Sequence, residues 1–173
     1  MIARGRTLAI TLVGVSAIVS TDLADRPPWL IWNASASVPI GLYAVERVGP
    51  LRAGDLVVVA PPEPLANFLA DGAYLPRGVR LMKHVAALPG QSVCRNGLTV
   101  SIDAVTVGEA RERDSRGRSL PVWQGCRVIA AGEVFLINAA ADSLDGRYFG
   151  PLPIASIIGR AAPLWTHRSA EEE

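Results

Sequence analysis

The sequence predicts a mostly β domain of the barrel or sandwich kind, with short helices, preceded by an N-terminal apolar helix. A chain of 173 residues is long enough for one domain with a real core and too short for two large ones. Half of the residues are apolar, and most of the 16 glycines and 13 prolines stand between short apolar runs, which is typical of a strand-rich fold with many turns. We therefore expect residues 1–28 to form a signal or anchor segment and linker, residues 29–166 the β domain, and residues 167–173 a polar tail.

The N-terminal run Thr7–Thr21 carries no charge and predicts the apolar helix. As a helix it spans about 22 Å, less than the ~30 Å hydrocarbon core of a bilayer, so it fits a signal-peptide apolar region or the body of a short anchor. Two arginines precede it and two aspartates follow, so the positive-inside rule directs the rest of the chain outward. A buried helix of a soluble protein is the alternative. Trp29 and Trp32 follow closely, at the membrane interface or in the core.

Apolar runs bounded by turn residues predict the strands. The segment Ser92–Ile102 is a hairpin pattern in which Asn96 and Gly97 would supply a type I′ turn. A short helix is expected over Pro64–Leu75, because proline opens it and apolar residues recur at helical spacing. Further extended segments are expected at Asp55–Ala60, Gly78–Gly90, Glu133–Asn138 and Ile154–Trp165.

The two cysteines, Cys94 and Cys126, can pair if the domain is exported. A bridge closing a loop of about 33 residues contributes ~3–4 kcal/mol on the chain-entropy model. The alternative is two reduced, buried cysteines. Two cysteines and two scattered histidines offer no metal-ligand spacing, so no metal site is expected. A net charge of +1, with arginines interleaved among acidic residues, argues against nucleic acid as a partner.

Ser35 and Ser37 stand one residue apart, just before the stiff sequence Val-Pro-Ile-Gly. They fit either a polar turn or a nucleophile on rigid backbone.

Lys83 lies in the middle of an apolar strand pattern, where burial would lower the pKa of its amine and let it accept a proton from a serine. An edge-strand lysine with its ammonium in water is the alternative. His84 is the rival base, but adjacent strand residues point to opposite faces, so Lys83 and His84 do not serve the same site.

Ser143, Asp145 and Arg147 alternate in the sequence, so in an extended segment they would share a face. Asp145 and Arg147 could pair and stiffen the segment, and the serine beside them could orient a neutral amine. The alternative is a surface turn with an exposed salt bridge, worth ~0–1 kcal/mol.

Taken in order, the stretches "SASVPIGLY", "RLMKHVAALPG", "DSLDGRYFGPLP" and "IIGRAAPLW" resemble the TraF-type peptidases of conjugal transfer systems, small relatives of signal peptidase I. The resemblance implies a membrane-linked, extracytoplasmic, signal-peptidase-like serine peptidase with a Ser/Lys dyad. By motif position it implies Ser37 as nucleophile, Lys83 as general base and Ser35 as an oxyanion-hole hydroxyl. Ser143 would orient the Lys83 amine, with Asp145 and Arg147 as support.

Departures from signal peptidase I argue against a general housekeeping role. Pro39 follows Ser37 after a single residue, and the Gly-Asp-Asn-Arg block of that enzyme is replaced by Ile137-Asn138-Ala139-Ala140. The chain also lacks room for a large accessory domain.

We therefore expect a serine endopeptidase without a cofactor that processes a pilin-like membrane protein, by hydrolysis or by cyclisation, for a conjugative (type IV secretion) apparatus. Its expected place is the periplasm, free or anchored to the inner membrane. The alternatives are general signal peptidase-like processing of exported proteins and a non-catalytic domain that binds a pilus component. A self-cleaving DNA-bound repressor is disfavoured by the apolar start and the charge.

Overall fold

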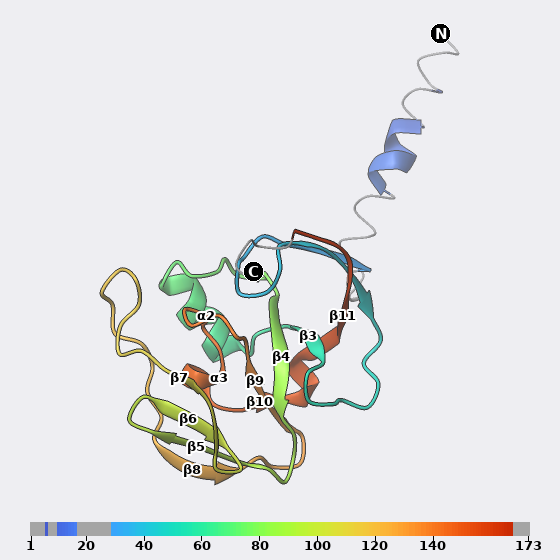
Figure 1. Ribbon diagram of the computed structural model, residues 1–173. Helices are drawn as coiled ribbons and strands as arrows, with labels where there is room; N and C mark the ends of the chain where they lie inside the picture. Colours follow the sequence, from blue (N-terminus) through green and yellow to red (C-terminus); the bar gives the residue numbers. More distant parts are fainter. Residues whose placement is uncertain (1–5, 7–9, 17–28, 168–173) are drawn as a thin grey trace.

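The computed structural model of the protein describes residues 6, 10–16 and 29–167 (Figure 1). Of the predicted N-terminal helix, residues 10–16 are helical, and the rest of that prediction lies outside the described residues, as does the tail beyond His167. Within the described part of the chain, no helix combines the length and apolar character needed to cross a bilayer. The domain limits at residues 28 and 166 stay predictions.

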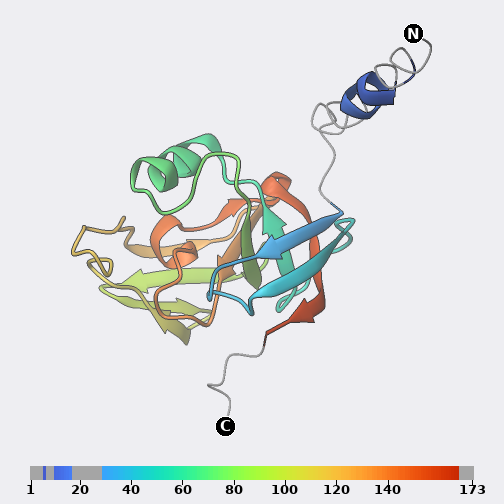
Figure 2. The same ribbon diagram turned by 90° about the horizontal axis from the view of Figure 1, so that it is seen from above.

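The described fold is mostly β, as predicted, and consists of two antiparallel sheets with short helices (Figures 1 and 2). The larger sheet has seven strands in the order β1-β2-β11-β3-β4-β9-β10. Its strands are β1 (Leu30–Asn33), β2 (Gly41–Glu46), β3 (Leu56–Val59), β4 (Leu81–Ala87), β9 (Glu133–Ile137), β10 (Leu152–Pro153) and β11 (Ile157–Thr166).

The smaller sheet has four strands in the order β7-β6-β5-β8. They are β5 (Ser92–Asn96), β6 (Thr99–Ile102), β7 (Val105–Glu109) and β8 (Gly125–Val128). The helical elements are α2 (Glu63–Asp71), α3 (Gly146–Phe149) and the 3₁₀ turn η1 (Ile154–Ser156). The predicted helix is thus present but shorter than expected, because the chain leaves it at Gly72.

The larger sheet is covered on both faces at β3, which explains the unbroken apolar run of this strand. Val57 and Val59 pack into one core cluster and Val58 into another, and all three side chains are fully buried. A strand buried on both faces has no polar alternation. The smaller sheet joins the core through Phe135 of β9, which packs with Val93 and Val100.

The predicted turn at Asn96 and Gly97 is wrong by one residue. Asn96 is still paired with Thr99, so Gly97 and Leu98 form the loop, and only Gly97 has a positive φ, of 62°. A type I′ turn needs positive φ at both central residues, whereas a glycine at the first central position is the preference of the type II′ turn. The next hairpin does place both central residues at positive φ, at Asp103 (47°) and Ala104 (68°), without an Asn-Gly signal.

Candidate active site

The serine loop, residues 34–40, joins β1 to β2 and is organised by one buried side chain, Asn33. The Asn33 Nδ2 group donates to the carbonyl oxygens of Ser35, Val38 and Pro39, at 2.8, 3.0 and 3.1 Å. The Asn33 Oδ1 atom accepts from the backbone N–H of Ser35 at 3.2 Å and from its hydroxyl at 3.1 Å. The Tyr43 hydroxyl also donates to the Pro39 carbonyl, at 2.6 Å. The loop is therefore a hydrogen-bonded unit rather than a loose turn.

The hydroxyls of Ser35 and Ser37 lie 3.1 Å apart within this loop. Ser37 is partly exposed, while the next residue, Val38, is buried to 3% exposure. The loop thus presents the Ser37 hydroxyl to solvent from backbone that is anchored on both sides.

Lys83 lies on β4, where its backbone pairs with Val57 of β3, and only 5% of the residue is exposed. Its Nζ donates to the Ser143 hydroxyl at 2.6 Å, and among the described residues it makes no ion pair. The edge-strand alternative is therefore wrong, because β4 is an inner strand and the amine is buried. Burial lowers the pKa of Lys83 from 10.5 to about 8, with Asp145 and Asp142 opposing the shift and Arg147 assisting it.

Asp145 and Arg147 form a buried ion pair, not an exposed one, with 2.8 Å between Oδ2 and Nη2. The predicted extended segment is wrong. Asp145 caps the short helix α3 by accepting from the backbone N–H of Arg147, and the guanidinium turns back to the carbonyls of Ala140 and Ser143. A Cβ on Gly146 would come within 2.7 Å of the Leu136 carbonyl oxygen, so the tight approach of α3 to β9 depends on glycine at this position.

Asn138 connects this ion pair to the strand that carries Lys83, and it is 1% exposed. Its side-chain Nδ2 donates to the Met82 carbonyl at 3.0 Å, and its Oδ1 accepts from the His84 N–H at 3.1 Å. Its own N–H donates to Asp145. The side chain thus continues the β4–β9 hydrogen bonding past the end of β9, on both sides of Lys83.

His84 does not share the position of Lys83. Its Nδ1 lies 3.2 Å from the Asn138 Oδ1 atom, and the residue is half-buried. The structure therefore gives the two neighbouring residues different partners, as strand alternation predicts.

One buried core cluster relates the serine loop to the lysine strand. Val38, which follows Ser37, and Met82, which precedes Lys83, belong to the same buried core cluster, together with Tyr43. The structure thus joins Ser35 to Ser37, Lys83 to Ser143 and Asp145 to Arg147, and it packs the chain neighbours of Ser37 and Lys83 into a shared core.

Cys94 and Cys126 form a disulfide between β5 and β8, where the two residues stand directly opposite each other with 4.0 Å between their Cα atoms. The bridge belongs to the smaller sheet. The next residue, Arg95, is 1% exposed and reaches the site, because its Nη1 donates to the Arg147 carbonyl at 2.6 Å. No cluster of metal-ligating side chains occurs in the described ranges.

Sequence reasoning gave no role to Asn33, Asn138 or Arg95. Each asparagine stands at or just beyond the end of an apolar strand, where asparagine is an ordinary turn residue. The sequence shows only that these polar residues stand beside apolar runs. That pattern fits a buried, hydrogen-bonded side chain and a solvated turn residue equally well.

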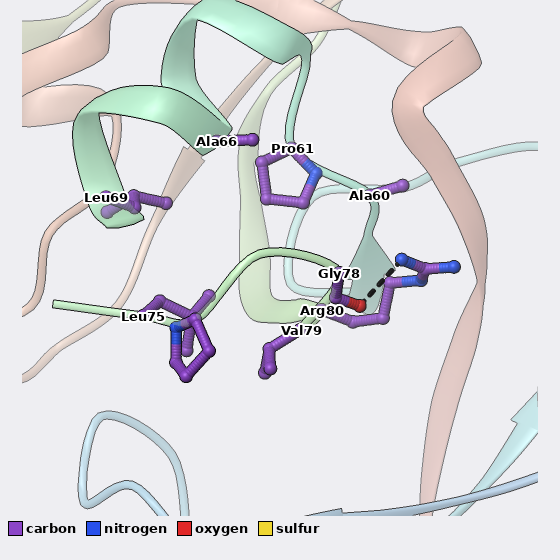
Figure 3. A pocket seen from close by; sticks show the side chains of 9 residues that line it. Ala60, Pro61, Ala66, Leu69, Leu75, Gly78, Val79 and Arg80 are labelled. Atoms are coloured by element: carbon purple, nitrogen blue, oxygen red, sulfur yellow. Dashed lines mark hydrogen bonds between the residues drawn. The ribbon is translucent and has the colours of Figure 1, made fainter. Parts of the chain in front are cut away.

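A small hollow of about 60 Å³ lies between α2 and the loop that leads into β4 (Figure 3). Its lining is apolar except for Arg80, whose guanidinium donates to the Gly78 carbonyl at 2.9 Å. None of its lining residues is a predicted catalytic residue.

Comparison with known proteins identifies the family. The model of the signal peptidase family, peptidase S26, matches residues 3–165. The chain belongs to this family. It is 35% identical over 143 residues to the conjugal transfer protein TraF of Agrobacterium fabrum, covering 78% of this chain and 81% of that protein. It is 34% identical over 176 residues to the probable conjugal transfer protein TraF of Sinorhizobium fredii, covering 95% and 92%.

The predicted resemblance to TraF-type proteins related to signal peptidase I is thereby confirmed, and membership of peptidase S26 supports a serine peptidase. A plasmid transfer protein TraF from Escherichia coli is 27% identical over 176 residues, covering 95% of this chain and 94% of that one. Among solved structures, a signal peptidase I from Enterococcus faecalis matches 65% of this chain and 97% of its own, with 20% identity and a TM-score of 0.40.

Proposed function

We propose that this protein is a serine endopeptidase in which Ser37 is the nucleophile and Lys83 the general base. The observation that carries the proposal is the Lys83 amine: it is buried, makes no ion pair among the described residues, and is held by the Ser143 hydroxyl at 2.6 Å. A lysine kept only for structure gains nothing from such a position, because a buried charge is costly unless it is paired. A lysine kept as a base gains a neutral form near physiological pH.

The protonation state of the amine suits this role. With the pKa of Lys83 at about 8, about a tenth of the amines are neutral at pH 7 and half at pH 8. A neutral amine can donate a hydrogen to Ser143 and still offer its lone pair to the Ser37 hydroxyl. Ser143 is therefore a positioning residue for the base. The Asp145–Arg147 ion pair supports Ser143, because the Arg147 guanidinium also donates to the Ser143 carbonyl.

The reaction then follows the acyl-enzyme route. Ser37 Oγ attacks the scissile carbonyl carbon, its proton passes to Lys83 Nζ, and the oxygen that becomes negative is stabilised by the Ser35 hydroxyl. The carbon–nitrogen bond breaks as Lys83 returns the proton to the leaving amine. Water then releases a linear product, whereas an amine from the same chain would release a ring; the acyl-enzyme permits both.

The proposed substrate is a pilin-like membrane protein of a conjugative, type IV secretion apparatus. The relatives that support this carry the names of conjugal and plasmid transfer proteins. The departures from signal peptidase I in the serine motif and before Ser143 favour such a dedicated substrate over processing of many exported proteins.

We further propose that the domain works on the periplasmic side of the inner membrane. Exposed aromatic and aliphatic side chains gather on β1 and β11, which both lie beside β2: Trp32 and Trp165 stack with 5.8 Å between ring centroids, and each is 56% exposed. Trp29, Leu30 and Leu164 are also exposed. Tryptophans are enriched where proteins meet the membrane interface, and the serine loop begins at the end of the same strand β1.

Two substitutions test the dyad with a matched control. Ser37→Ala and Lys83→Ala should each abolish cleavage of a co-expressed pilin-like substrate, because one removes the nucleophile and the other the base. His84→Ala, one residue along β4, should retain cleavage. Normal cleavage by Lys83→Ala together with a dead His84→Ala would show that the base has been assigned wrongly.

Mass spectrometry of the product distinguishes its possible fates. A mass lower by one water than that of the trimmed linear peptide reports a ring, and the full mass reports hydrolysis.

Incubation with ordinary exported preproteins tests the general-peptidase alternative. Failure of a serine-directed acylating probe to label Ser37 would support a non-catalytic binding domain instead.

A further inference from the structure

We infer that Asn33 is a positioning residue that sets the direction of the hydroxyl protons of Ser35 and Ser37. The inference deepens the proposed function and rests on it, because it concerns the nucleophile and the oxyanion donor of that reaction. Asn33 is 7% exposed, and within the described part of the chain its side chain forms hydrogen bonds only with residues of the serine loop.

The orientation of the Asn33 amide follows from its neighbours. Its Nδ2 atom faces the carbonyl oxygens of Ser35, Val38 and Pro39, which only accept hydrogen bonds. Its Oδ1 atom faces the backbone N–H of Ser35, which only donates. Flipping the amide would lose all four bonds, so the oxygen must be the atom beside the Ser35 hydroxyl.

This orientation decides where the hydroxyl protons lie. Because Oδ1 carries no hydrogen, the 3.1 Å contact makes Ser35 the donor to Asn33. A serine hydroxyl has one proton, so Ser35 cannot also donate to Ser37, and the 3.1 Å contact between the two serines makes Ser37 the donor to Ser35. In the resting loop the protons therefore run in one direction, from Ser37 to Ser35 to Asn33.

In this arrangement the Ser35 hydroxyl is kept close to the nucleophile, and its proton is not donated to Ser37. When a substrate carbonyl enters, the Ser35 hydroxyl turns from Asn33 Oδ1 to the carbonyl oxygen, and Asn33 still holds the Ser35 backbone N–H. The Ser37 hydroxyl turns from Ser35 to the Lys83 amine. As the bond between Ser37 Oγ and the carbonyl carbon forms, the Ser37 proton passes to Lys83 Nζ and the carbonyl electron pair moves to the oxygen. Asn33 and Ser35 gain and lose no proton, so their part is orientation alone.

The contrasting explanation is that Asn33 only folds the loop. The structure offers a matched control for that, because the Tyr43 hydroxyl also holds the Pro39 carbonyl, at 2.6 Å, and among the described residues it forms no hydrogen bond with either serine. A purely structural role predicts that Tyr43→Phe and Asn33→Ala differ only in how much stability they remove. A proton-directing role predicts that they differ in the rate of acylation in the folded protein.

The experiment uses the full chain and a peptidyl p-nitrophenyl ester with a small residue next to the ester. Release of p-nitrophenolate gives the acylation rate at saturating ester, mass spectrometry locates the acyl group, and denaturant unfolding gives the stability. The variants are Asn33→Ala, Ser35→Ala, their double substitution, Tyr43→Phe and Ser37→Ala. We expect Asn33→Ala and Ser35→Ala each to lower the acylation rate about 10²-fold, the loss typical of one oxyanion donor. Tyr43→Phe should stay within about threefold of the parent.

The double substitution shows whether Asn33 acts through Ser35 or independently of it. If Asn33 acts through Ser35, the double variant should be as slow as Asn33→Ala, because the second change removes a hydroxyl already misdirected. Losses that multiply to about 10⁴-fold, or a parent-like rate for folded Asn33→Ala, would overturn the inference. If Asn33→Ala does not fold, Ser35→Ala decides instead, because it leaves the three bonds from Asn33 Nδ2 to the loop carbonyls in place: a parent-like acylation rate for folded Ser35→Ala would show that Asn33 cannot act through this hydroxyl and would also overturn the inference.

Failure of the proposed function would look different. If the parent protein takes no acyl group at Ser37, or if Ser37→Ala is labelled as well as the parent, the assignment of the nucleophile fails. Labelling at Ser37 in the parent, together with unchanged labelling in Asn33→Ala, would leave the proposed function standing and remove only the role of Asn33.

Discussion

A lysine that titrates near pH 8 in the folded protein must change the stability of the fold over the same pH range. The pKa of Lys83 falls from 10.5 to about 8 on burial, so the unfolded chain holds this proton more tightly than the folded one. Because the unfolded state binds more protons above pH 8, stability rises with pH there. The full gain is roughly 3 kcal/mol, of which about 2 kcal/mol appears between pH 7 and pH 9.5.

The substitution Lys83→Met isolates this effect, because methionine fills similar space and does not titrate. Denaturant unfolding of both proteins from pH 6.5 to 9.5 gives two stability curves, and their difference should grow by about 2 kcal/mol in favour of the parent. Burial raises the pKa of Tyr43, which lowers stability at the alkaline end, but Tyr43 is present in both proteins and cancels in the difference. Parallel curves would show that the amine is not dry in the folded state, and the case for Lys83 as a neutral base would fail without any activity assay.

The remaining predictions concern catalysis, the Asn138 hydrogen bonds to β4, the disulfide and the exposed tryptophans. The acylation rate of the parent should rise about fivefold from pH 7 to pH 8, following the neutral fraction of Lys83, and a rate already constant across that range would count against a lysine base. Asn138→Ala should lower the free energy of unfolding by about 2–3 kcal/mol, since it leaves the buried Met82 carbonyl and the partly buried His84 N–H without this partner. An unchanged unfolding midpoint would show that these hydrogen bonds do not stabilise the fold. Reduction of the Cys94–Cys126 bridge should cost about 3–4 kcal/mol of stability, measured by unfolding with and without dithiothreitol. Trp165→Ser should weaken binding to vesicles of phosphatidylethanolamine and phosphatidylglycerol in a co-sedimentation assay, and equal binding of both proteins would remove the aromatic surface as a membrane contact.

The strands illustrate how far local sequence reaches. The run Leu56–Val59 forms β3, and the run around Lys83 forms β4, because short β-branched and apolar segments bounded by turn residues have few other stable conformations. The hairpin turn shows where that reasoning ends. Asn96 and Gly97 are a strong turn signal, yet the loop lies one residue later, because the pairing of β5 with both β6 and β8 sets the register.

By itself the sequence determined the mostly β class, the placement of Lys83 within an apolar strand and the family, since each follows from residue types and their spacing along the chain. Only the tertiary structure decided which polar groups meet. The Lys83–Ser143 hydrogen bond joins residues 60 positions apart, and the contact of Asn138 with the Met82 carbonyl spans 56. Such contacts depend on strand register, on bulges and on where a strand ends, none of which is encoded in a short window. Asn33 and Asn138 look like ordinary turn residues until the fold buries them, and once buried, each must satisfy its amide with the backbone around the candidate nucleophile or base.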